Sequence, residues 1–343
     1  MTTDLDSRPI CILGLGLIGG SLMRDLAAQG RSVFGYNRSP SSAAEAAKEG
    51  FDVSAELEAT LDRAEAEHAL IVLATPMTTV SKLLDAINEH APSCGFTDVV
   101  SVKTRVYELV RERGMADRSV GGHPMAGTAD SGWKASKEGL FKGAAWVVTF
   151  DQALGPNGET DNQPSETWVE VWKRVVTMAS AVGAEVVPAR VQIHDAAVAR
   201  ISHLPHLLAE ALAIVGDNGG ALAQSLAAGS FRDGTRVAGS SPSLVRAMCE
   251  TNETALLEAL DEALELLTDA RAELASASPS VEDLVDAGYR SRIRFEARRG
   301  KLSESVTPTT LSNRPVLRFH PGAPKWVAQL VQAETLGARI EVF

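Results

Sequence analysis

The first half of the chain alternates short, continuous apolar runs with longer segments in which apolar residues recur at helical spacing. A short apolar run between turn signals is typical of a strand buried on both faces of a parallel sheet. The runs predict strands at residues 10–13, 32–36, 69–74, 97–102, 119–124 and 183–188. The segments between them predict helices, among them residues 41–49, 78–90, 104–113 and 167–182. This alternation predicts an α/β fold, with a Rossmann-type doubly wound sheet over residues 1–188.

The pattern changes at residue 189, where long Ala- and Leu-rich segments begin and no further strand is predicted before residue 300. Helices are expected at residues 191–215, 220–227, 243–269 and 281–299. Residues 229–236 are expected to form a short polar loop between two of them. The second domain, residues 189–300, is therefore predicted to be all-helical. Its apolar faces are wider than one small bundle needs, which indicates a homodimer formed through this domain.

The last segment, residues 301–343, is predicted to be a polar linker followed by a small separate element. The pattern predicts a strand and turn at 316–322, a helix at 325–336 and a strand at 338–343. This order resembles the first half of an ACT-type regulatory domain, but it is too short for a whole one. One hypothesis is that two such tails pair across the dimer. The alternative is a strand patch that binds no ligand.

Composition limits the partners of the chain. Of its 343 residues 45% are apolar, and the formal net charge of −11 argues against nucleic acid or an anionic membrane as a partner. The three cysteines, Cys11, Cys94 and Cys249, are scattered, as expected in a reducing compartment, and their spacing suggests neither disulfides nor a metal cluster. The N-terminus is polar and no apolar run approaches a membrane span, so a soluble cytoplasmic protein is expected.

The strongest local motif is the glycine-rich turn after the first predicted strand. Gly14, Gly16 and Gly19 have the G-x-G-x-x-G spacing of a dinucleotide-binding turn. The first glycine allows the sharp turn, the second lets the backbone approach a pyrophosphate, and the third lets the helix pack on the strand. The alternative is a purely structural turn. The predicted site also includes the residues between these glycines, Leu15, Leu17 and Ile18.

The end of the second predicted strand indicates which dinucleotide is bound. An NAD-preferring domain places an acidic residue there, which accepts hydrogen bonds from the ribose hydroxyls. Here Asn37 is neutral, Arg38 can meet a 2′-phosphate with its planar guanidinium, and Ser39 adds a hydroxyl donor. NADP is therefore the expected cofactor, with NAD possible. The alternative is that Arg38 is a solvated loop charge.

Polar residues follow three other predicted strands, where ligands of parallel sheets bind. Thr75 and Pro76 end one strand, and Ser101 ends the next. Taken alone, Thr75 and Ser101 could equally be helix caps. His123 is more informative, because residues 121–127, GGHPMAG, surround one imidazole with glycine and proline. That composition indicates a fixed backbone aimed at a ligand, although a structural histidine is the alternative.

In the helical domain, residues 201–206 read ISHLPH. His203 and His206 stand three residues apart and are expected to share a helix face, while Pro205 should kink the helix. A kink beside two histidines favours a ligand site. A zinc site is the alternative, but the only further ligands nearby are His194 and Asp195, so no metal is expected.

The predicted loop at residues 229–236 carries two guanidinium groups, on Arg232 and Arg236. Either could hold a carboxylate through two parallel hydrogen bonds. A surface salt bridge is the alternative for both, and it is weaker for Arg236.

Together these motifs resemble the prephenate/arogenate dehydrogenases of tyrosine synthesis. The resemblance covers roughly residues 9–300, and the motifs occur in the order of the family. They are GLGLIGGS at 14–21, SVK at 101–103, GHPMAG at 122–127, SHLPH at 202–206 and RDGTR at 232–236.

The resemblance implies an oxidative decarboxylation in which a hydride goes from the substrate ring to nicotinamide and the ring carboxylate leaves as CO2. It implies that His123 binds the 4-hydroxyl and helps remove its proton, with support from Ser101. It also implies that Arg236 holds a substrate carboxylate and that His206 lines the substrate pocket. The other substrate-binding candidates lie in the same motif as His206; they are Ser202 and His203.

Two other functions stay open on the sequence. The first is a 3-hydroxyacid-type dehydrogenase of similar architecture, which usually needs a lysine base, and Lys103 is its candidate. The second is a non-catalytic regulator that senses a dinucleotide. The choice between prephenate and arogenate is also open, because residues 240–245, SSPSLV, depart from the usual pattern of the family.

Overall fold

A computed structural model describes residues 8–128, 130–299 and 314–343. The chain forms two compact units, one made of Met1–His194 with Pro315–Phe343 and the other of Asp195–Arg314. The linker expected at residues 301–313 lies outside the described residues.

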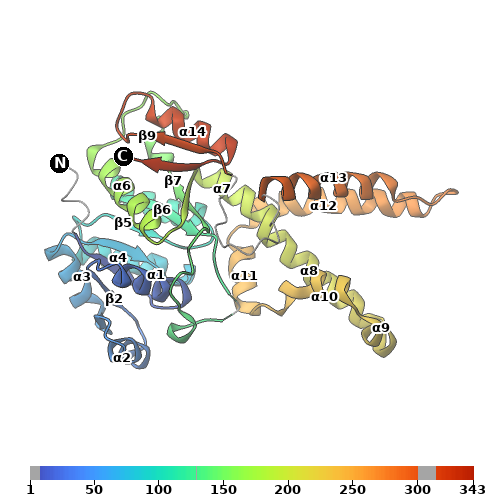
Figure 1. Ribbon diagram of the computed structural model, residues 1–343, viewed down its shortest axis with the longest axis horizontal. Coiled ribbons are helices and arrows are strands. Elements are labelled where there is room, and N and C mark those ends of the chain that lie inside the picture. The colour runs from blue at the N-terminus through green and yellow to red at the C-terminus, as the bar shows by residue number, and fades with distance from the viewer. Residues whose placement is uncertain (1–7, 129, 300–313) are drawn as a thin grey trace, which may run out of the picture. The chain divides into compact units, whose positions relative to one another are not determined.

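The first unit is built on one eight-stranded sheet with the strand order β3-β2-β1-β4-β5-β6-β7-β8 (Figure 1). Every neighbouring pair is parallel except β6 and β7. The first six strands have the order of a dinucleotide-binding fold, which confirms the predicted fold class. Two of the strands, β3 and β7, were not predicted. The strands are β1 (Ile10–Leu13), β2 (Val33–Tyr36), β3 (Val53–Ser54), β4 (Leu70–Leu73), β5 (Phe96–Asp98), β6 (Ser119–Pro124), β7 (Ala145–Thr149) and β8 (Glu185–Ala189).

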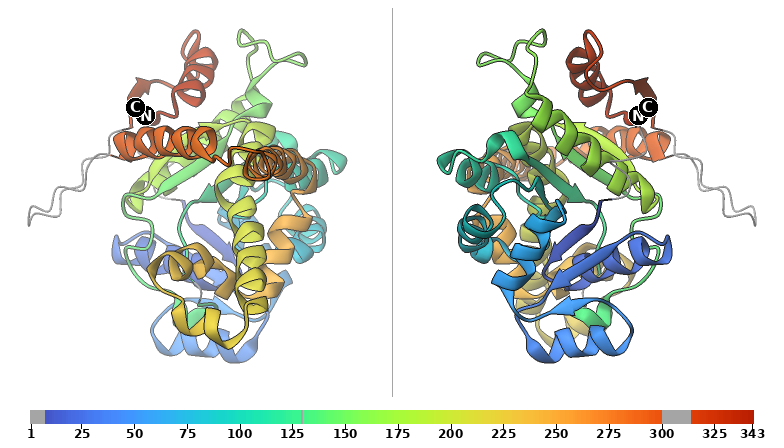
Figure 2. Two further views of the ribbon diagram at one scale, coloured as in Figure 1. Left: turned by 90° about the vertical axis from the view of Figure 1, so that its right-hand side faces the viewer. Right: turned by 90° about the vertical axis from the view of Figure 1, so that its left-hand side faces the viewer.

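Helices cover both faces of this sheet, and alternate residues of the central strands face the two layers (Figure 2). Ile10 and Ile12 of β1 belong to one apolar core, with residues of α1 and α6. Cys11 and Leu13 belong to the other, with residues of α3, α4 and α5. This explains why the strands have no polar face. The helices are α1 (Leu17–Ala28), α2 (Pro40–Lys48), α3 (Leu57–Ala66), α4 (Met77–His90), α5 (Thr104–Glu112) and α6 (Glu166–Ala181).

The described part of the second unit is helical, as predicted, with no strand between residues 195 and 299. By length and composition alone, the continuous helical segment Val191–Asn218 could cross a membrane. The elements from this segment onward are α7 (Val191–Val198), the π-helical turn η4 (Ala199–His203), α8 (Leu204–Asn218), α9 (Gly220–Leu226), α10 (Gly229–Thr235), the 3-10 turn η5 (Arg236–Gly239), α11 (Pro242–Glu250), α12 (Glu253–Leu274) and α13 (Glu282–Arg299).

Two local predictions for this unit are wrong. The expected loop at residues 229–236 is mostly the helix α10. The ring of Phe231 packs against Gly216 of α8, and this tertiary contact outweighs the low helix propensity of the glycines in α10. The expected helix at residues 243–269 is broken at Thr251 and Asn252, where the side chain of Asn252 bonds to other parts of the unit.

The C-terminal element has the predicted strand–helix–strand order: β9 (Val316–Phe319), α14 (Trp326–Leu336) and β10 (Arg339–Val342). The two strands pair in parallel, and Figure 1 shows the element in red next to the C-terminus. Within the first unit it packs on α6 through aromatic rings. The ring centroid of Trp172 in α6 lies 5.4 Å from that of Trp326 and 6.4 Å from that of Phe319. Pairing of two such tails across a dimer stays a hypothesis.

Candidate active site

The glycine-rich turn joins β1 to α1 as the spacing predicts. Gly14 has a φ of +101°, and a Cβ at Gly19 would lie 2.0 Å from the carbonyl oxygen of Gly14, so neither position accepts a side chain without movement. A Cβ at Gly16 would meet no atom within 4 Å. The turn therefore leaves open space beside the N-terminus of α1, where free amide groups favour an anion. This arrangement fits a pyrophosphate.

The end of β2 carries the three residues expected to select the cofactor. The backbone N–H of Asn37 donates to the Ser54 carbonyl at 3.0 Å, which fixes the strand end. Ser39 is the N-cap of α2, and its hydroxyl accepts from the Ser42 N–H at 3.4 Å. Arg38 lies exposed between them. A guanidinium and a second helix N-terminus thus stand at this edge of the sheet.

The register of the sheet brings the other strand-end candidates to the same edge. Leu13, Leu73, Asp98 and Gly121 are partners in one row across β1, β4, β5 and β6. The row spans three strand spacings, roughly 14 Å. On three of these strands, a candidate residue lies two or three positions after the residue that belongs to the row. They are Thr75 after β4, Ser101 after β5 and His123 in β6.

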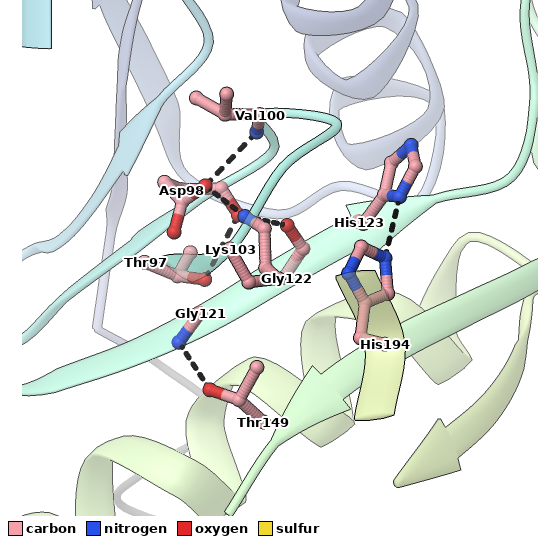
Figure 3. A network of polar contacts seen from close by, with 9 residues as sticks. All are labelled: Thr97, Asp98, Val100, Lys103, Gly121, Gly122, His123, Thr149 and His194. Atoms are coloured by element: carbon pink, nitrogen blue, oxygen red, sulfur yellow. Dashed lines mark hydrogen bonds and ion pairs between the residues drawn. The ribbon is translucent and has the colours of Figure 1, made fainter. Parts of the chain in front are cut away.

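The central feature of this edge is a contact between two imidazoles. The Nδ1 atom of His123 lies 2.9 Å from the Nε2 atom of His194, and the two rings are inclined at 75° (Figure 3). His194 is the fourth residue of α7, at the end of its first turn, and is only 3% exposed. One of the two nitrogens must donate and the other accept, so the contact links the protonation of the two rings. This contact was not predicted, because the sequence indicated His194 only as a possible zinc ligand.

A buried ion pair fixes the backbone next to His123. Lys103 pairs with Asp98 and also donates to the Gly122 carbonyl at 2.6 Å (Figure 3). Burial raises the pKa of Asp98 above its ordinary value, and the ammonium of Lys103 opposes that shift. Since Lys103 is 1% exposed and held by these bonds, it is poorly placed to act as the base that a hydroxyacid dehydrogenase needs.

The two histidines of the helical unit have different surroundings. Nδ1 of His206 donates to the Ser202 carbonyl at 2.8 Å, and the side chain is partly exposed. His203 is 1% exposed, and its Nδ1 lies 3.1 Å from the amide nitrogen of Asn252, which also donates to the Asp195 carbonyl. His203 is thus buried within this unit, and its role in substrate binding stays a prediction. The π-helical turn η4 ends at His203, and the α-helix α8 begins at Leu204.

Arg232 in α10 and Arg236, which directly follows this helix, are both exposed. Among the described residues, no carboxylate forms an ion pair with either guanidinium. The salt-bridge alternative for these two arginines therefore finds no partner in the described part of the chain. Nor do the described residues contain a group of three or more His, Cys, Asp or Glu side chains suited to a metal ion.

The N-terminus of α7, which carries His194, is capped by Asp151. The carboxylate accepts the Val191 N–H at 2.9 Å, and burial raises the pKa of Asp151 to about 6. Asp151 borders a cavity of about 20 Å³, which has room for one water molecule. The polar residues around this cavity include Asp98, Lys103, Tyr107 and Thr149.

Comparison with known proteins identifies the family. The sequence model described as prephenate dehydrogenase, nucleotide-binding domain, matches residues 22–180, and the one described as its dimerization domain matches residues 190–287. This chain belongs to the prephenate dehydrogenase family. Both parts of a prephenate dehydrogenase are present, with Lys103 and His123 in the first match and His194, His206 and Arg236 in the second. The C-terminal element lies beyond both matches.

Individual relatives agree with this assignment. Prephenate dehydrogenase of Bacillus subtilis is 33% identical over 270 residues, which are 74% of this chain and 66% of that protein. A crystal structure from Corynebacterium glutamicum, provisionally named a prephenate dehydrogenase, is 64% identical with a TM-score of 0.90, covering 98% of this chain and 99% of that one. Arogenate dehydrogenase of Synechocystis is 30% identical with a TM-score of 0.68, covering 84% and 100%.

The raised pKa of Asp151 leads to a prediction about stability. The folded state holds a proton more tightly than the unfolded state, so the stability that protonated Asp151 contributes is present below about pH 4 and is lost as pH rises through about 6. Asp151→Asn keeps an oxygen to accept the Val191 N–H but carries no charge. The free energy of unfolding of Asp151→Asn, minus that of the native protein, should therefore increase from pH 4 to pH 8. The expected gain is about 3 kcal/mol, at about 1.4 kcal/mol per pKa unit.

Urea unfolding of both proteins at the two pH values, at one protein concentration, measures this difference. Asp161→Asn, which removes an exposed carboxylate further along the same loop, is the control and should show no such trend. An equal effect of Asp151→Asn at both pH values would contradict the assignment.

Proposed function

We propose that this chain is an NADP-dependent dehydrogenase that oxidatively decarboxylates prephenate or arogenate. The observation that carries the proposal is the His123–His194 contact at the edge of the sheet that also bears the dinucleotide turn. Membership of the family supports the substrate class. The test is the formation of reduced cofactor with prephenate and with arogenate, each in the presence of NADP and of NAD.

His123 is the base in this proposal. If its Nδ1 carries the hydrogen and donates to His194, then Nε2 is the nitrogen that accepts the proton of the substrate 4-hydroxyl. Contact with His194 also stabilises the imidazolium that forms, much as a carboxylate does for a catalytic histidine. When bound, the nicotinamide ring supplies the hydride acceptor. Loss of the ring carboxylate as CO2 then makes the ring aromatic, and Ser101 supports the hydroxyl contact.

The helical unit supplies the groups for the anionic side of the substrate. Arg236 is proposed to hold a carboxylate with its planar guanidinium, which has no carboxylate partner among the described residues. His206 and Ser202 are proposed to line the substrate pocket. The bond from His206 Nδ1 to the Ser202 carbonyl assigns the hydrogen to that nitrogen, so Nε2 is its acceptor.

We also infer a homodimer formed through the helical unit. Three side chains of α13, spaced four residues apart, are exposed: Val285 by 58%, Tyr289 by 67% and Ile293 by 45%. An exposed apolar stripe of this kind indicates a surface that another chain covers. The dimerization-domain match over residues 190–287 supports this inference.

His123→Asn should lower turnover by roughly two to four orders of magnitude, because it removes the general base. Dinucleotide affinity and the fold should be unchanged. His68→Asn is the control, since His68 is exposed and has a φ of +52°, which asparagine tolerates. Steady-state kinetics of the two variants measure the effect, and turnover within a few-fold of native in His123→Asn would refute the role of the base.

Arg236→Lys should raise KM for the substrate by roughly tenfold or more, because lysine keeps the charge but loses two parallel hydrogen bonds. The value of kcat should change much less. Arg246→Lys, in an exposed pair with Glu250, serves as the control and should leave both constants near native. An unchanged KM in Arg236→Lys would move the role to another residue, with Arg232 the next candidate.

The native protein should bind NADP at least tenfold more tightly than NAD, a difference of roughly 1.4 kcal/mol. The reason is that Asn37 brings no negative charge to repel the 2′-phosphate, while Arg38 attracts it. The double variant Asn37→Asp with Arg38→Ala should lose or reverse this preference. Titration of both proteins with both dinucleotides tests the prediction, and equal affinities in the native protein would exclude it.

A further inference from the structure

The C-terminal element is bonded to the helix that carries His194. Glu334 of α14, whose side chain is 5% exposed, accepts the backbone N–H of Arg190 at 2.6 Å. It also accepts Nε of Arg190 at 2.8 Å and pairs with Nη2 at 2.6 Å. Arg190 directly precedes α7, and its carbonyl accepts the N–H of His194 at 2.8 Å. A carboxylate near the end of the chain thus holds the first residue of this helical turn.

Two carboxylates together fix the start of α7. Glu334 satisfies the N–H of Arg190, and Asp151 satisfies the N–H of Val191. Amide groups at a helix N-terminus have no partner inside the helix, and the oxygens of these two side chains supply partners for two of them. Because Glu334 and Asp151 come from different elements, their bonds determine both the position and the direction of the first turn.

The position of α7 in turn determines the contact with His123. The Nδ1–Nε2 separation of 2.9 Å is an ordinary hydrogen-bond length, and hydrogen bonds weaken steeply once they lengthen or bend. A shift of α7 by about 1 Å would remove this bond. His194 is also buried, so its ring has little room to follow the movement.

We propose that Glu334 is a positioning residue for His123. It anchors α7 so that His194 keeps its bond to His123 Nδ1. In this proposal the hydrogen of that bond is on His123 Nδ1, so Nε2 is the nitrogen that accepts a proton. The effect on catalysis rests on the proposed function, but the effect on the geometry of the two histidines does not. The C-terminal element, which lies beyond both family matches, thereby acquires a role in the active site.

The test compares Glu334→Ala and Glu334→Gln with Glu341→Gln in the full-length chain. Glu341 belongs to the same element, and its partly exposed carboxylate pairs with Arg318 and Arg339 instead of Arg190. Its variant also removes one charge from this element and is therefore the matched control. Nitrogen-15 NMR of labelled histidine reports the tautomer of His123, with His123→Asn assigning its signals. Steady-state kinetics give kcat and KM in parallel.

In native protein and in Glu341→Gln, we expect one dominant tautomer of His123, with the hydrogen on Nδ1. Glu334→Ala should give a mixture and lower kcat by roughly ten- to a hundredfold, with KM for the dinucleotide within about twofold of native. Glu334→Gln keeps the bond to the Arg190 N–H but loses the ion pair, so a smaller change in the same direction is expected. The conservative variant thus gives partial rescue.

Native-like His123 signals and kcat in Glu334→Ala would overturn the proposal. If that variant unfolds below the assay temperature, Glu334→Gln decides: unchanged signals and kcat contradict the positioning role, and shifted ones support it. If the native chain oxidises neither prephenate nor arogenate, the proposed function fails, and the NMR comparison still decides the role of Glu334.

Discussion

The site depends on the position of one backbone segment, Gly121–His123 in β6. The Gly121 N–H donates to the hydroxyl of Thr149 at 2.9 Å, and the Gly122 carbonyl accepts from Lys103. Lys103 is itself paired with Asp98 in the interior. Breaking a buried pair by removing one partner typically costs about 3–5 kcal/mol, because the remaining charge is left uncompensated. The backbone before His123 is therefore held by interactions that are costly to lose.

The sheet explains how His194 reaches this segment from a distant part of the chain. His123 is the partner of Val147 in β7, and Val147 is the partner of Val187 in β8. The three residues form one row that is two strand spacings wide, roughly 10 Å. The helix α7 begins shortly after β8, and its first turn brings His194 back to His123. The strand β7, which is antiparallel to β6 and parallel to β8, thus connects the cofactor-binding part of the sheet to the strand that leads into α7.

The sequence predicted the features that depend on local pattern. Residue spacing and apolar runs are local properties of the sequence. They were enough to predict the glycine turn, the parallel strands and the residues at the ends of these strands. The His123–His194 contact depends on the pairing of β6, β7 and β8, and no local signal encodes that pairing. The rule that ligands lie beyond the carboxyl ends of parallel strands does not indicate His194, because β8 runs antiparallel to β5 and its carboxyl end lies at the other edge of the sheet.

Other differences have the same origin. The segment at residues 229–236 contains residues typical of a loop, yet the contact of Phe231 with α8 makes most of it helical. The expected helix at residues 243–269 is broken at Asn252, whose side chain donates to the Asp195 carbonyl and contacts the buried His203. In both cases a tertiary contact outweighed a local preference.

The most direct test of the account uses substrate labelled with carbon-13 at the ring carboxylate. Prephenate and arogenate are each incubated with the native protein and NADP, and labelled CO2 and reduced dinucleotide are measured together. We expect one of the two substrates to yield both products in equal amounts. Reduced dinucleotide without labelled CO2, as a hydroxyacid-type oxidation would give, or no reduction with either substrate would contradict it.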